Sequence, residues 1–483
     1  MPSENIYSSK VTGAGHLHVV FLPFFATSHA IPLVHVARLF AAQGVRSTII
    51  TTVYNALIFQ SSVDRDISAG LPIAVQTLNF PASEVGLPVG VENLNAVTNQ
   101  EMSSAVIRGI MMLQTSMEQL IRSLAADCIF SDMFFPWTAD LNIPRLLFYP
   151  SCFLYHSIFD SLKVHKPHEK LQSESESFVV PNLPDKITMK RSQVSDLFKF
   201  KTQMGEMMET IKQSEKKSYG LVHNTFYEIE PDYADHYKKI KGTKIWHIGP
   251  LFQYFISDGV TSEKQSCLKW LDSQKPKSVI YVCFGSMVKF PEAQITEIAL
   301  ALEESKQPFI WVVRKKVGDE EIGGLPEGFQ ERIEREKKGL IMTEWAPQVE
   351  ILRHPAVGGF LSHCGWNSVL ETIVSGVPMM TWPLYAEHFY NEKLVELLGI
   401  GVGVGVDVWN SSSVITSPII GKRSIIDAIE ILTGGSAMAE SIRRSSQEIA
   451  MKAKHVVEEG GSSHNDLMAL IEELKTIKLA PKP

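Results

Sequence analysis

The chain has 483 residues, which points to two domains rather than one core, and its 45% hydrophobic and 20% charged content is typical of globular proteins. Its formal net charge of −7 excludes a broad basic surface, so no nucleic-acid partner is expected. The polar first residues and the lack of a long apolar run predict a cytosolic protein with no signal peptide or membrane span. Five scattered cysteines without a CxxC pair predict neither disulfides nor a zinc site.

The first half of the chain alternates apolar, strand-like runs with helical patterns. The expected strands cover residues 17–24, 46–52, 73–80 and 127–132, and the expected helices cover residues 31–44 and Met102–Leu124. Such alternation predicts βαβ units on a parallel sheet, with ligands bound at the C-terminal ends of the strands.

The second half repeats this pattern after a loose, polar stretch at residues 253–267, which we interpret as a linker. Strand-like runs recur at residues 278–286, 308–314, 339–347, 357–363 and 377–385, and helical patterns at residues 294–305 and 368–376. The predicted fold is therefore α/β, with two doubly wound domains facing each other across a cleft. The last helical pattern, at residues 463–477, fits either domain.

The segment GGFLSHCGWNSVLETIVSGVP, Gly358–Pro378, predicts a strand, a tight turn and a helix. Gly365 permits the turn, and Asn367 and Ser368 begin the helix, where free N–H groups and the helix dipole favour an anion such as a phosphate. His363 adds a further hydrogen-bond donor beside them. The alternative interpretation is a plain helix start with no ligand.

Three further residues fit a nucleotide. Glu371 lies one helical turn after Asn367, where it can accept hydrogen bonds from a ribose diol. Trp345, in the turn WAPQ, offers a flat ring for stacking on a base, an interaction worth about 1 to 3 kcal/mol. Ser286 ends a strand in a Gly-Ser turn, a common phosphate-binding position. Each of these signals is weak by itself. A tryptophan after a strand, for example, belongs more often to the core.

In the first domain, His29 follows the first expected strand and begins a helix that Thr27 or Ser28 can cap. A helix N-terminus disfavours the imidazolium, so we expect His29 to stay neutral, as a general base must. Asp132 ends another expected strand. If the two strands are neighbours, the carboxylate of Asp132 can accept a hydrogen bond from one ring nitrogen of His29, which leaves the other nitrogen free to take a proton. The alternative interpretation is that His29 is a core or capping residue. From His29 and Asp132 alone, the two interpretations are about equally favoured.

The sequence Asp64-Arg65-Asp66 matches the DxD pattern by which many metal-dependent sugar transferases hold a divalent ion. It lies in a polar segment, far along the chain from the phosphate-binding pattern. We therefore interpret it as a solvated charged turn and expect no metal site.

The run Trp345–His388 resembles, at nearly every defining position, the signature segment of the plant secondary-product UDP-glycosyltransferases of family 1. The similarity extends to FLPF and the histidine after it, SDMFFPW, SEKKSYGLVHNTFYEIEP, CFGS and GGSSHNDL, and so covers essentially the whole chain. It looks closest to members that act on triterpenoid or steroid aglycones and saponins.

The resemblance implies the two-domain GT-B fold. The implied parts are an acceptor-binding domain at residues 1–250, a linker at 251–264, a UDP-sugar-binding domain at 265–465, and a C-terminal helix and tail at 466–483 that packs back on the first domain. It also implies an inverting displacement at the anomeric carbon, without metal or cofactor, in a monomer whose partners are a UDP-sugar co-substrate and a small-molecule acceptor.

The same resemblance implies a role for each matching residue. Trp345 and Ala346 would contact uracil, Gln348 and Glu371 the ribose, Ser286, His363, Gly365, Asn367 and Ser368 the diphosphate, and Trp366, Glu387 and His388 the sugar, with His29 as the base and Asp132 as its partner.

Three departures from the family pattern bear on function. Ser28 precedes the histidine where most relatives have glycine. The segment FPWTADLNIPRLLF lacks about four residues of a helix, roughly one turn, which predicts altered acceptor-pocket walls or lower stability. His388 stands where glucosyl-transferring members have glutamine and several galactosyl-transferring members have histidine, so UDP-galactose is favoured over UDP-glucose.

The leading hypothesis is transfer of a hexose to a hydroxyl of a bulky apolar metabolite. The alternatives are a homologue that binds a UDP-sugar with little or no transfer, a flavonoid or phenolic glucosyltransferase, and, more remotely, an epimerase of nucleotide sugars. Acceptor-dependent release of UDP would separate the transferases from the other two.

Overall fold

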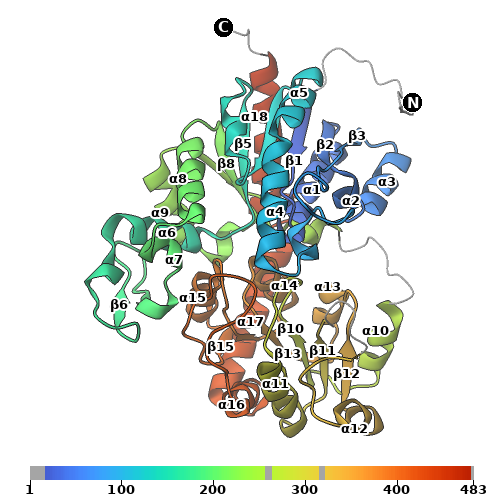
Figure 1. The fold of residues 1–483 in the computed structure, drawn as a ribbon, viewed down its shortest axis with the longest axis vertical. Coiled ribbons are helices and arrows are strands. Elements are labelled where there is room, and N and C mark those ends of the chain that lie inside the picture. The colour runs from blue at the N-terminus through green and yellow to red at the C-terminus, as the bar shows by residue number, and fades with distance from the viewer. Residues whose placement is uncertain (1–16, 256–263, 315–320, 480–483) are drawn as a thin grey trace.

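The computed structural model describes residues 17–255, 264–314 and 321–479, which form two α/β domains stacked along the long axis of the molecule (Figure 1). Most of the predicted linker, 251–264, lies outside the described residues. Its described ends are a 3-10 turn, Leu251–Phe255, and the first residue of helix α10, Lys264–Asp272.

The first domain contains a sheet of seven parallel strands in the order β3-β2-β1-β4-β5-β8-β9. All five residues of β1 are buried, because helices cover both faces of the sheet and the strand needs apolar side chains on both sides. The strands are β1 His18–Leu22, β2 Arg46–Thr52, β3 Ile73–Leu78, β4 Cys128–Asp132, β5 Arg145–Tyr149, β8 Gly220–His223 and β9 Lys244–His247.

The helices of this domain include one difference from the sequence prediction. The expected helix Met102–Leu124 is present as two helices that break at Leu113, whose N–H is shared between the carbonyls of Gly109 and Ile110. The helices are α1 Thr27–Ala42, α2 Val53–Ala56, α3 Gln60–Ser68, α4 Gln100–Met112, α5 Gln114–Ser123, α6 Phe153–His165, α7 Asp196–Lys199, α8 Gln203–Glu215 and α9 Pro231–Lys241. A small antiparallel pair, β6 Ser177–Val179 and β7 Thr188–Lys190, extends from the domain.

The short segment FPWTADLNIPRLLF, residues 135–148, covers most of the connection after β4 and the first four residues of β5. Before β5 begins at Arg145, it contains only the 3-10 turn Pro136–Asp140. Arg145, 1% exposed, holds this connection by donating from Nε to Ser131 Oγ at 2.8 Å and from Nη2 to the Phe135 carbonyl at 3.4 Å. Burial lowers the pKa of the Arg145 guanidinium to about 10, although nearby anionic groups oppose the shift. A single turn and a buried arginine thus link the two strands.

The second domain contains a sheet of six parallel strands in the order β12-β11-β10-β13-β14-β15. The strands are β10 Val279–Cys283, β11 Phe309–Val312, β12 Gly339–Met342, β13 Val357–Ser362, β14 Met379–Thr381 and β15 Gly401–Gly403. The helices are α11 Glu292–Glu304, α12 Phe329–Arg335, α13 Gln348–Leu352, α14 Trp366–Ser375, α15 His388–Leu398, α16 Lys422–Thr433 and α17 Ala437–His455. The prediction of two doubly wound, parallel α/β domains is confirmed.

The last helix, α18 Ser462–Leu479, follows α17 but lies against the first sheet (Figure 1). The N–H of His247 donates to Asp466 Oδ2 at 3.0 Å, and Lys244 pairs with Glu473. Its apolar residues Leu467, Leu470, Ile471 and Leu474 are buried in the core of the first domain. Helix α18 begins at Ser462, so the predicted boundary between residues 465 and 466 lies within its first turn.

Among the described helices, none combines the length and the apolar character that a membrane crossing requires.

Candidate active site

The start of α1 carries His29 and is held by a residue from outside the helix. Neither Thr27 nor Ser28 caps it, which corrects the sequence prediction: the N-cap is Ala26, without a side-chain hydrogen bond. The N–H of Thr27 instead donates to Asn95 Oδ1 at 2.8 Å. A distant asparagine therefore satisfies one of the free N–H groups at this helix terminus.

His29 and Asp132 meet because β1 and β4 are adjacent, with Leu22 opposite Ser131. Nδ1 of His29 donates to Asp132 Oδ2 at 2.8 Å. Asp132 is 0% exposed and its other oxygen accepts the N–H of Phe134 at 3.0 Å, whereas His29 remains 21% exposed. The pair therefore presents Nε2 of the imidazole with its lone pair free.

The charge state of His29 differs from the sequence expectation. Burial by itself lowers the pKa of the imidazole, but the charge and hydrogen bond of Asp132, with a further contribution from Glu387, outweigh burial and raise the pKa above its ordinary value. The helix start alone suggested a more persistently neutral ring. Because the carboxylate is closer and fully buried, it dominates and makes His29 a stronger base.

Aromatic side chains enclose the histidine. The rings of Phe24 and Phe134 lie 5.7 and 5.5 Å from that of His29, centroid to centroid, and 4.5 Å from each other. Phe24 and Phe134 each lie two residues after a strand, β1 and β4 respectively. They form an apolar wall beside the imidazole, suited to an apolar acceptor.

In the second domain, two glycines make room for the His363 ring at the end of β13. A Cβ atom on Gly285 would lie 2.8 Å from Nε2 of His363, and one on Gly365 would lie 2.5 Å from the same nitrogen. Gly285 also has a φ of +77°, which favours glycine. Burial lowers the pKa of His363 to about 4, so the ring offers a neutral N–H rather than a cation.

Gln348, Ser368 and Glu371 form one cluster. Nε2 of Gln348 donates to Ser368 Oγ at 3.0 Å and to Glu371 Oε2 at 2.6 Å. Burial raises the pKa of Glu371 to about 7, the hydrogen bond from Gln348 opposes the rise, and the charge of Glu350 adds to it. Near this cluster in sequence, Trp345 is 62% exposed, so one ring face is available for stacking. Ala346 after it is buried.

Two residues predicted for the diphosphate contact the first domain. Nδ2 of Asn367 donates to the carbonyl of Ser28 at 2.9 Å, one residue before the base. Ser286 accepts a hydrogen bond from Nδ2 of Asn95. The sequence analysis gave Asn95 no role, since an asparagine in a turn carries no signal of what lies opposite it in space.

The neighbours Glu387 and His388 lie at the start of α15. Burial raises the pKa of Glu387. Attraction to His29, in the opposite domain, partly offsets this rise. His388 is 4% exposed, its Nδ1 accepts the N–H of Tyr385 at 3.4 Å, and its ring meets that of His363 edge-on at 4.8 Å. Burial, reinforced by His363, holds the pKa of His388 well below its ordinary value. The ring is therefore neutral and carries its proton on Nε2.

The side chain of Trp366 lies at the interface between the two domains. It is 2% exposed and packs in a core cluster that also contains residues of the first domain. Its Nε1–H donates to the carbonyl of Asn224 at 2.7 Å. The indole thus joins the two domains, where burying a large ring removes apolar area from water. The contact between Trp366 and the sugar stays a prediction.

The DxD sequence lies on α3 and is engaged in local contacts. Oδ2 of Asp66 accepts from Nε of Arg38 at 2.5 Å, and Asp64 accepts from Gln60 at 2.7 Å. Within the described ranges, no group of three or more His, Cys, Asp or Glu side chains is arranged to hold a metal ion.

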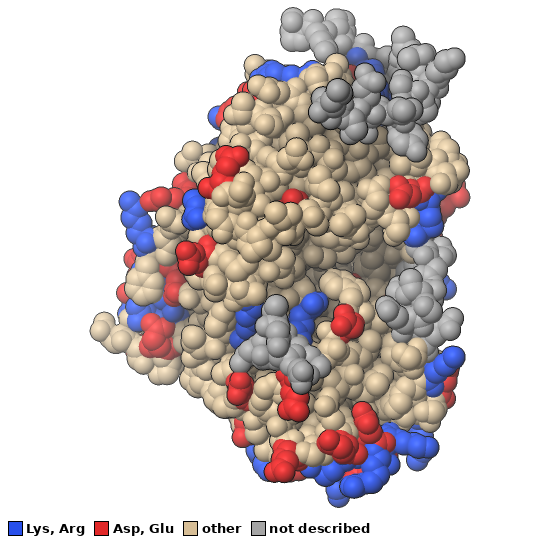
Figure 2. Space-filling view, turned by 45° about the vertical axis from the view of Figure 1, so that its right-hand side comes forward, with Lys and Arg blue, Asp and Glu red and all other residues tan. Residues whose placement is uncertain are grey.

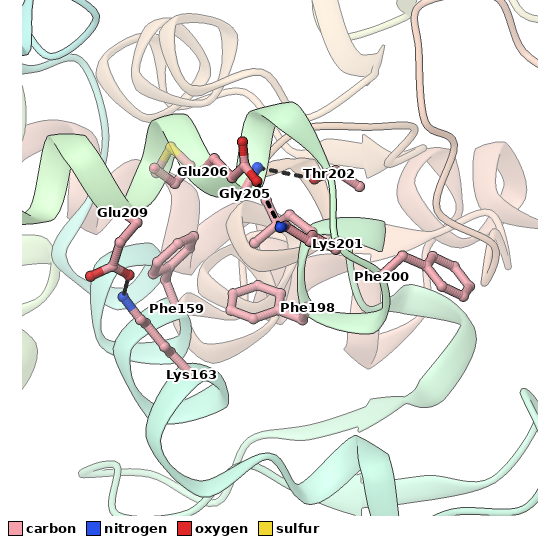
Figure 3. A pocket seen from close by; sticks show the side chains of 11 residues that line it. Phe159, Lys163, Phe198, Phe200, Lys201, Thr202, Gly205, Glu206 and Glu209 are labelled. Atoms are coloured by element: carbon pink, nitrogen blue, oxygen red, sulfur yellow. Dashed lines mark hydrogen bonds and ion pairs between the residues drawn. The ribbon is translucent and has the colours of Figure 1, made fainter.

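A recess lies between the two domains on the face shown in Figure 2, and mostly uncharged side chains surround it. A separate pocket of about 270 Å³ lies in the first domain between α6, α7 and α8, with Phe159 and Phe198 at its floor (Figure 3). The ion pair Lys163–Glu209 and the pair Lys201–Glu206 lie at its side. None of the predicted site residues lines this pocket, so it is distinct from the site around His29.

The chain is similar to known proteins in sequence and in fold. The sequence profile of the family described as "UDP-glucoronosyl and UDP-glucosyl transferase" matches residues 247–418. The chain is 48% identical to solanidine UDP-glucose glucosyltransferase 1 of Solanum tuberosum, over 96% of this chain and 98% of that protein. It is 45% identical to soyasapogenol B glucuronide galactosyltransferase of Glycine max, over 96% and 97%. Glucosyltransferase is the commoner name among the relatives.

A solved structure is similar over the same extent. The Glycyrrhiza uralensis UGT crystallised with glycyrrhetinic acid 3-O-monoglucuronide superimposes with a TM-score of 0.91 at 40% identity, over 96% of each chain. The resemblance predicted from the run Trp345–His388 is thereby confirmed, as is the GT-B fold. The chain belongs to the plant family 1 UDP-glycosyltransferases, and it is a transferase enzyme.

Proposed function

We propose that this enzyme transfers a hexose from a UDP-sugar to a hydroxyl of a steroid or triterpenoid aglycone or saponin. The observation that carries the proposal is the hydrogen-bonded His29–Asp132 pair at the start of α1. Glu387, from the second domain, contributes to the raised pKa of His29. A base in one domain and a carboxylate for the sugar in the other are what the proposed transfer needs. Solanidine, soyasapogenol and glycyrrhetinic acid derivatives in the names of the similar proteins support the acceptor class.

In the proposed reaction, Nε2 of His29 takes the proton of the acceptor hydroxyl as its oxygen attacks the anomeric carbon. The bond between that carbon and the UDP oxygen breaks, the configuration inverts, and UDP leaves with the bonding electron pair. Asp132 stabilises the imidazolium that forms. General-base assistance of this kind contributes about 10²- to 10⁴-fold in rate.

The nucleotide is assigned to the second domain. Trp345 stacks on uracil with Ala346 beside it, and Gln348 and Glu371 hold the ribose. Ser286, His363, Gly365, Asn367 and Ser368 surround the diphosphate, whose developing charge is met by the N–H groups at the start of α14. These oriented dipoles support a reaction without a metal ion. The proposal includes a cytosolic, monomeric enzyme. Turnover is expected to be unchanged in EDTA; a loss that Mg²⁺ restores would contradict this part.

The identity of the hexose is the finer part of the proposal. The preference for galactose rests on His388 alone, and the names of the relatives favour glucose more often than galactose. We therefore assign to His388 the choice of donor, through one N–H from Nε2 near the sugar.

A matrix of acceptors and donors tests the activity. The purified enzyme, with UDP-glucose, UDP-galactose or UDP-glucuronate and steroid, triterpenoid or flavonoid acceptors, is expected to give a mass gain of one hexose on the steroid or triterpenoid. Products only on flavonoids would favour the phenolic alternative, and UDP binding without any product would favour the non-transferring alternative.

The base is tested separately. His29→Ala is expected to abolish turnover and leave UDP affinity unchanged, since the UDP contacts lie in the other domain. His455→Ala, at the exposed end of α17, is the matched control and should keep full activity. Turnover retained by His29→Ala would refute the proposed role of His29.

A further inference from the structure

Residues 93–97 lie beside the turn that begins α1, and two hydrogen bonds attach them to it. The N–H of Leu94 donates to the carbonyl of Phe25 at 2.9 Å, and the N–H of Thr27 donates to Asn95 Oδ1 at 2.8 Å. These bonds flank the helix start that carries His29. The position of residues 93–97 is therefore coupled to the position of the base.

A buried polar network holds this segment on the first domain. Nδ2 of Asn93 donates to Asn55 Oδ1 at 2.7 Å, and Oδ1 of Asn93 accepts the N–H of Asn95 at 2.8 Å. Nδ2 of Asn55 donates to the carbonyl of Glu92 at 3.1 Å. Asn93, Asn55 and Glu92 are all buried. Satisfied buried networks are rigid, so the segment is a fixed platform rather than a loose loop.

The other side of the platform faces the second domain. Nδ2 of Asn95 donates to Ser286 Oγ, and the carbonyl of Val97 accepts from Nζ of Lys289 at 2.9 Å. Ser286 and Lys289 both follow β10 of the second sheet. One carboxamide, that of Asn95, thus bonds the helix of the base with its oxygen and the loop of Ser286 with its nitrogen.

We propose that Asn95 is a positioning residue that couples the loop of Ser286 to the start of the helix carrying His29. The inference rests on the roles proposed above for Ser286 at the diphosphate and His29 at the acceptor. Asn95 aligns the two halves of the site when the domains are together, so that the base and the donor are held in one geometry. Precise alignment of reacting groups is a large part of catalysis in a reaction of two substrates.

Two substitutions separate this role from a merely structural one. Asn95→Ala removes both bonds, so the alignment is lost while the remaining UDP contacts persist. Asn95→Asp keeps an oxygen for the N–H of Thr27 and an oxygen that can accept from the hydroxyl of Ser286, but it adds a negative charge beside the proposed diphosphate position. The first change should act on kcat and the second on donor affinity.

The expected results are opposite in the two variants. Asn95→Ala should lower kcat at least about tenfold with donor KM within about threefold of the wild-type value, since both aligning hydrogen bonds are lost. Asn95→Asp should keep kcat within about threefold and raise donor KM about tenfold through charge repulsion. Asn99→Ala and Asn99→Asp are matched controls, because Asn99 accepts the N–H of Met102 at 2.9 Å as an exposed cap of α4.

Measuring UDP affinity by calorimetry tests the inference about Asn95 without relying on turnover. Asn95→Asp should bind UDP about tenfold more weakly than Asn99→Asp, even if the wild-type protein transfers no sugar and the proposed function fails. If the Asn95 variants match the Asn99 variants in kcat, donor KM and UDP affinity, the inference is overturned. It is also overturned if both Asn95 variants lower kcat and thermal stability alike, without the split between kcat and KM.

Discussion

Nδ1 of His29 lies 2.8 Å from Oδ2 of Asp132, although 103 residues separate the two in the chain. The carboxylate is fully buried and the imidazole is partly open to the cleft. Burial lowers the pKa of His29, but Asp132 reverses the shift, so the net pKa is raised. Asp132 therefore both orients the imidazole of His29 and raises its basicity.

Replacing Asp132 by Asn should move the pH profile of kcat/KM. Transfer requires neutral His29, so activity rises as pH increases through the pKa of His29. Without the carboxylate this pKa falls, the acidic limb moves to lower pH, and the plateau rate drops by about 10²- to 10⁴-fold because a weaker, less well oriented base remains. Initial rates from about pH 5 to pH 9 span the ordinary range of histidine and measure both effects. An acidic limb that stays in place would contradict the coupling.

UDP affinity should depend on the charge of Glu371. Its pKa is raised to about 7, primarily by burial. Ribose hydroxyls donate to the ionised carboxylate, so UDP binding lowers this pKa and releases a proton, and affinity rises with pH up to about 7 and then levels off. Calorimetry in two buffers of different ionisation enthalpy measures the released proton. In Glu371→Gln the release and the pH dependence should both fall to the part that the terminal phosphate of UDP contributes, since that phosphate titrates at about pH 6; a variant that keeps the wild-type pH dependence would exclude Glu371 as a source.

Trp366→Phe should affect stability rather than sugar binding. The change keeps most of the buried ring but removes the hydrogen bond from Nε1 to the Asn224 carbonyl. Leaving that buried carbonyl without this donor should lower the free energy of unfolding by about 1 to 3 kcal/mol. Thermal or urea unfolding measures the loss, and donor KM should stay within about twofold, far less than a lost hydrogen bond to the sugar would cause. A large rise in donor KM with unchanged stability would instead support the predicted contact between Trp366 and the sugar.

His388→Gln should change donor preference. Neutral His388 offers one N–H from Nε2, whereas glutamine offers an amide with two donors and one acceptor at a different reach. Because glucose and galactose differ only in the orientation of the 4-hydroxyl, gaining or losing one matched hydrogen bond should change the ratio of kcat/KM for UDP-galactose and UDP-glucose by about tenfold, towards glucose. His354→Gln, at the edge of the second domain beside Asp272, is a matched histidine control. An unchanged ratio would remove His388 from donor selection.

Much of the second-domain site could be predicted from sequence because its residues are close together in the chain. The strand, turn and helix around His363 and Asn367 follow from local apolar pattern and glycine placement. The neighbourhood of Gln348 and Glu371 follows from the family resemblance, and the structure joins the two at 2.6 Å. Short-range pattern carries such information because helices and strands set the spacing of nearby side chains.

The sequence by itself determined the parallel α/β domains and the family, and it named His29 and Asp132 as a possible base and partner if their strands are neighbours. Only the tertiary structure decided that the charge of Asp132 outweighs the helix start at His29, that Trp366 is a buried link to Asn224, and that Asn95 bridges the two domains. The reason is physical. Periodicity and turn chemistry act over a few residues, whereas burial, pKa and cross-domain hydrogen bonds depend on partners that folding brings together from distant parts of the chain.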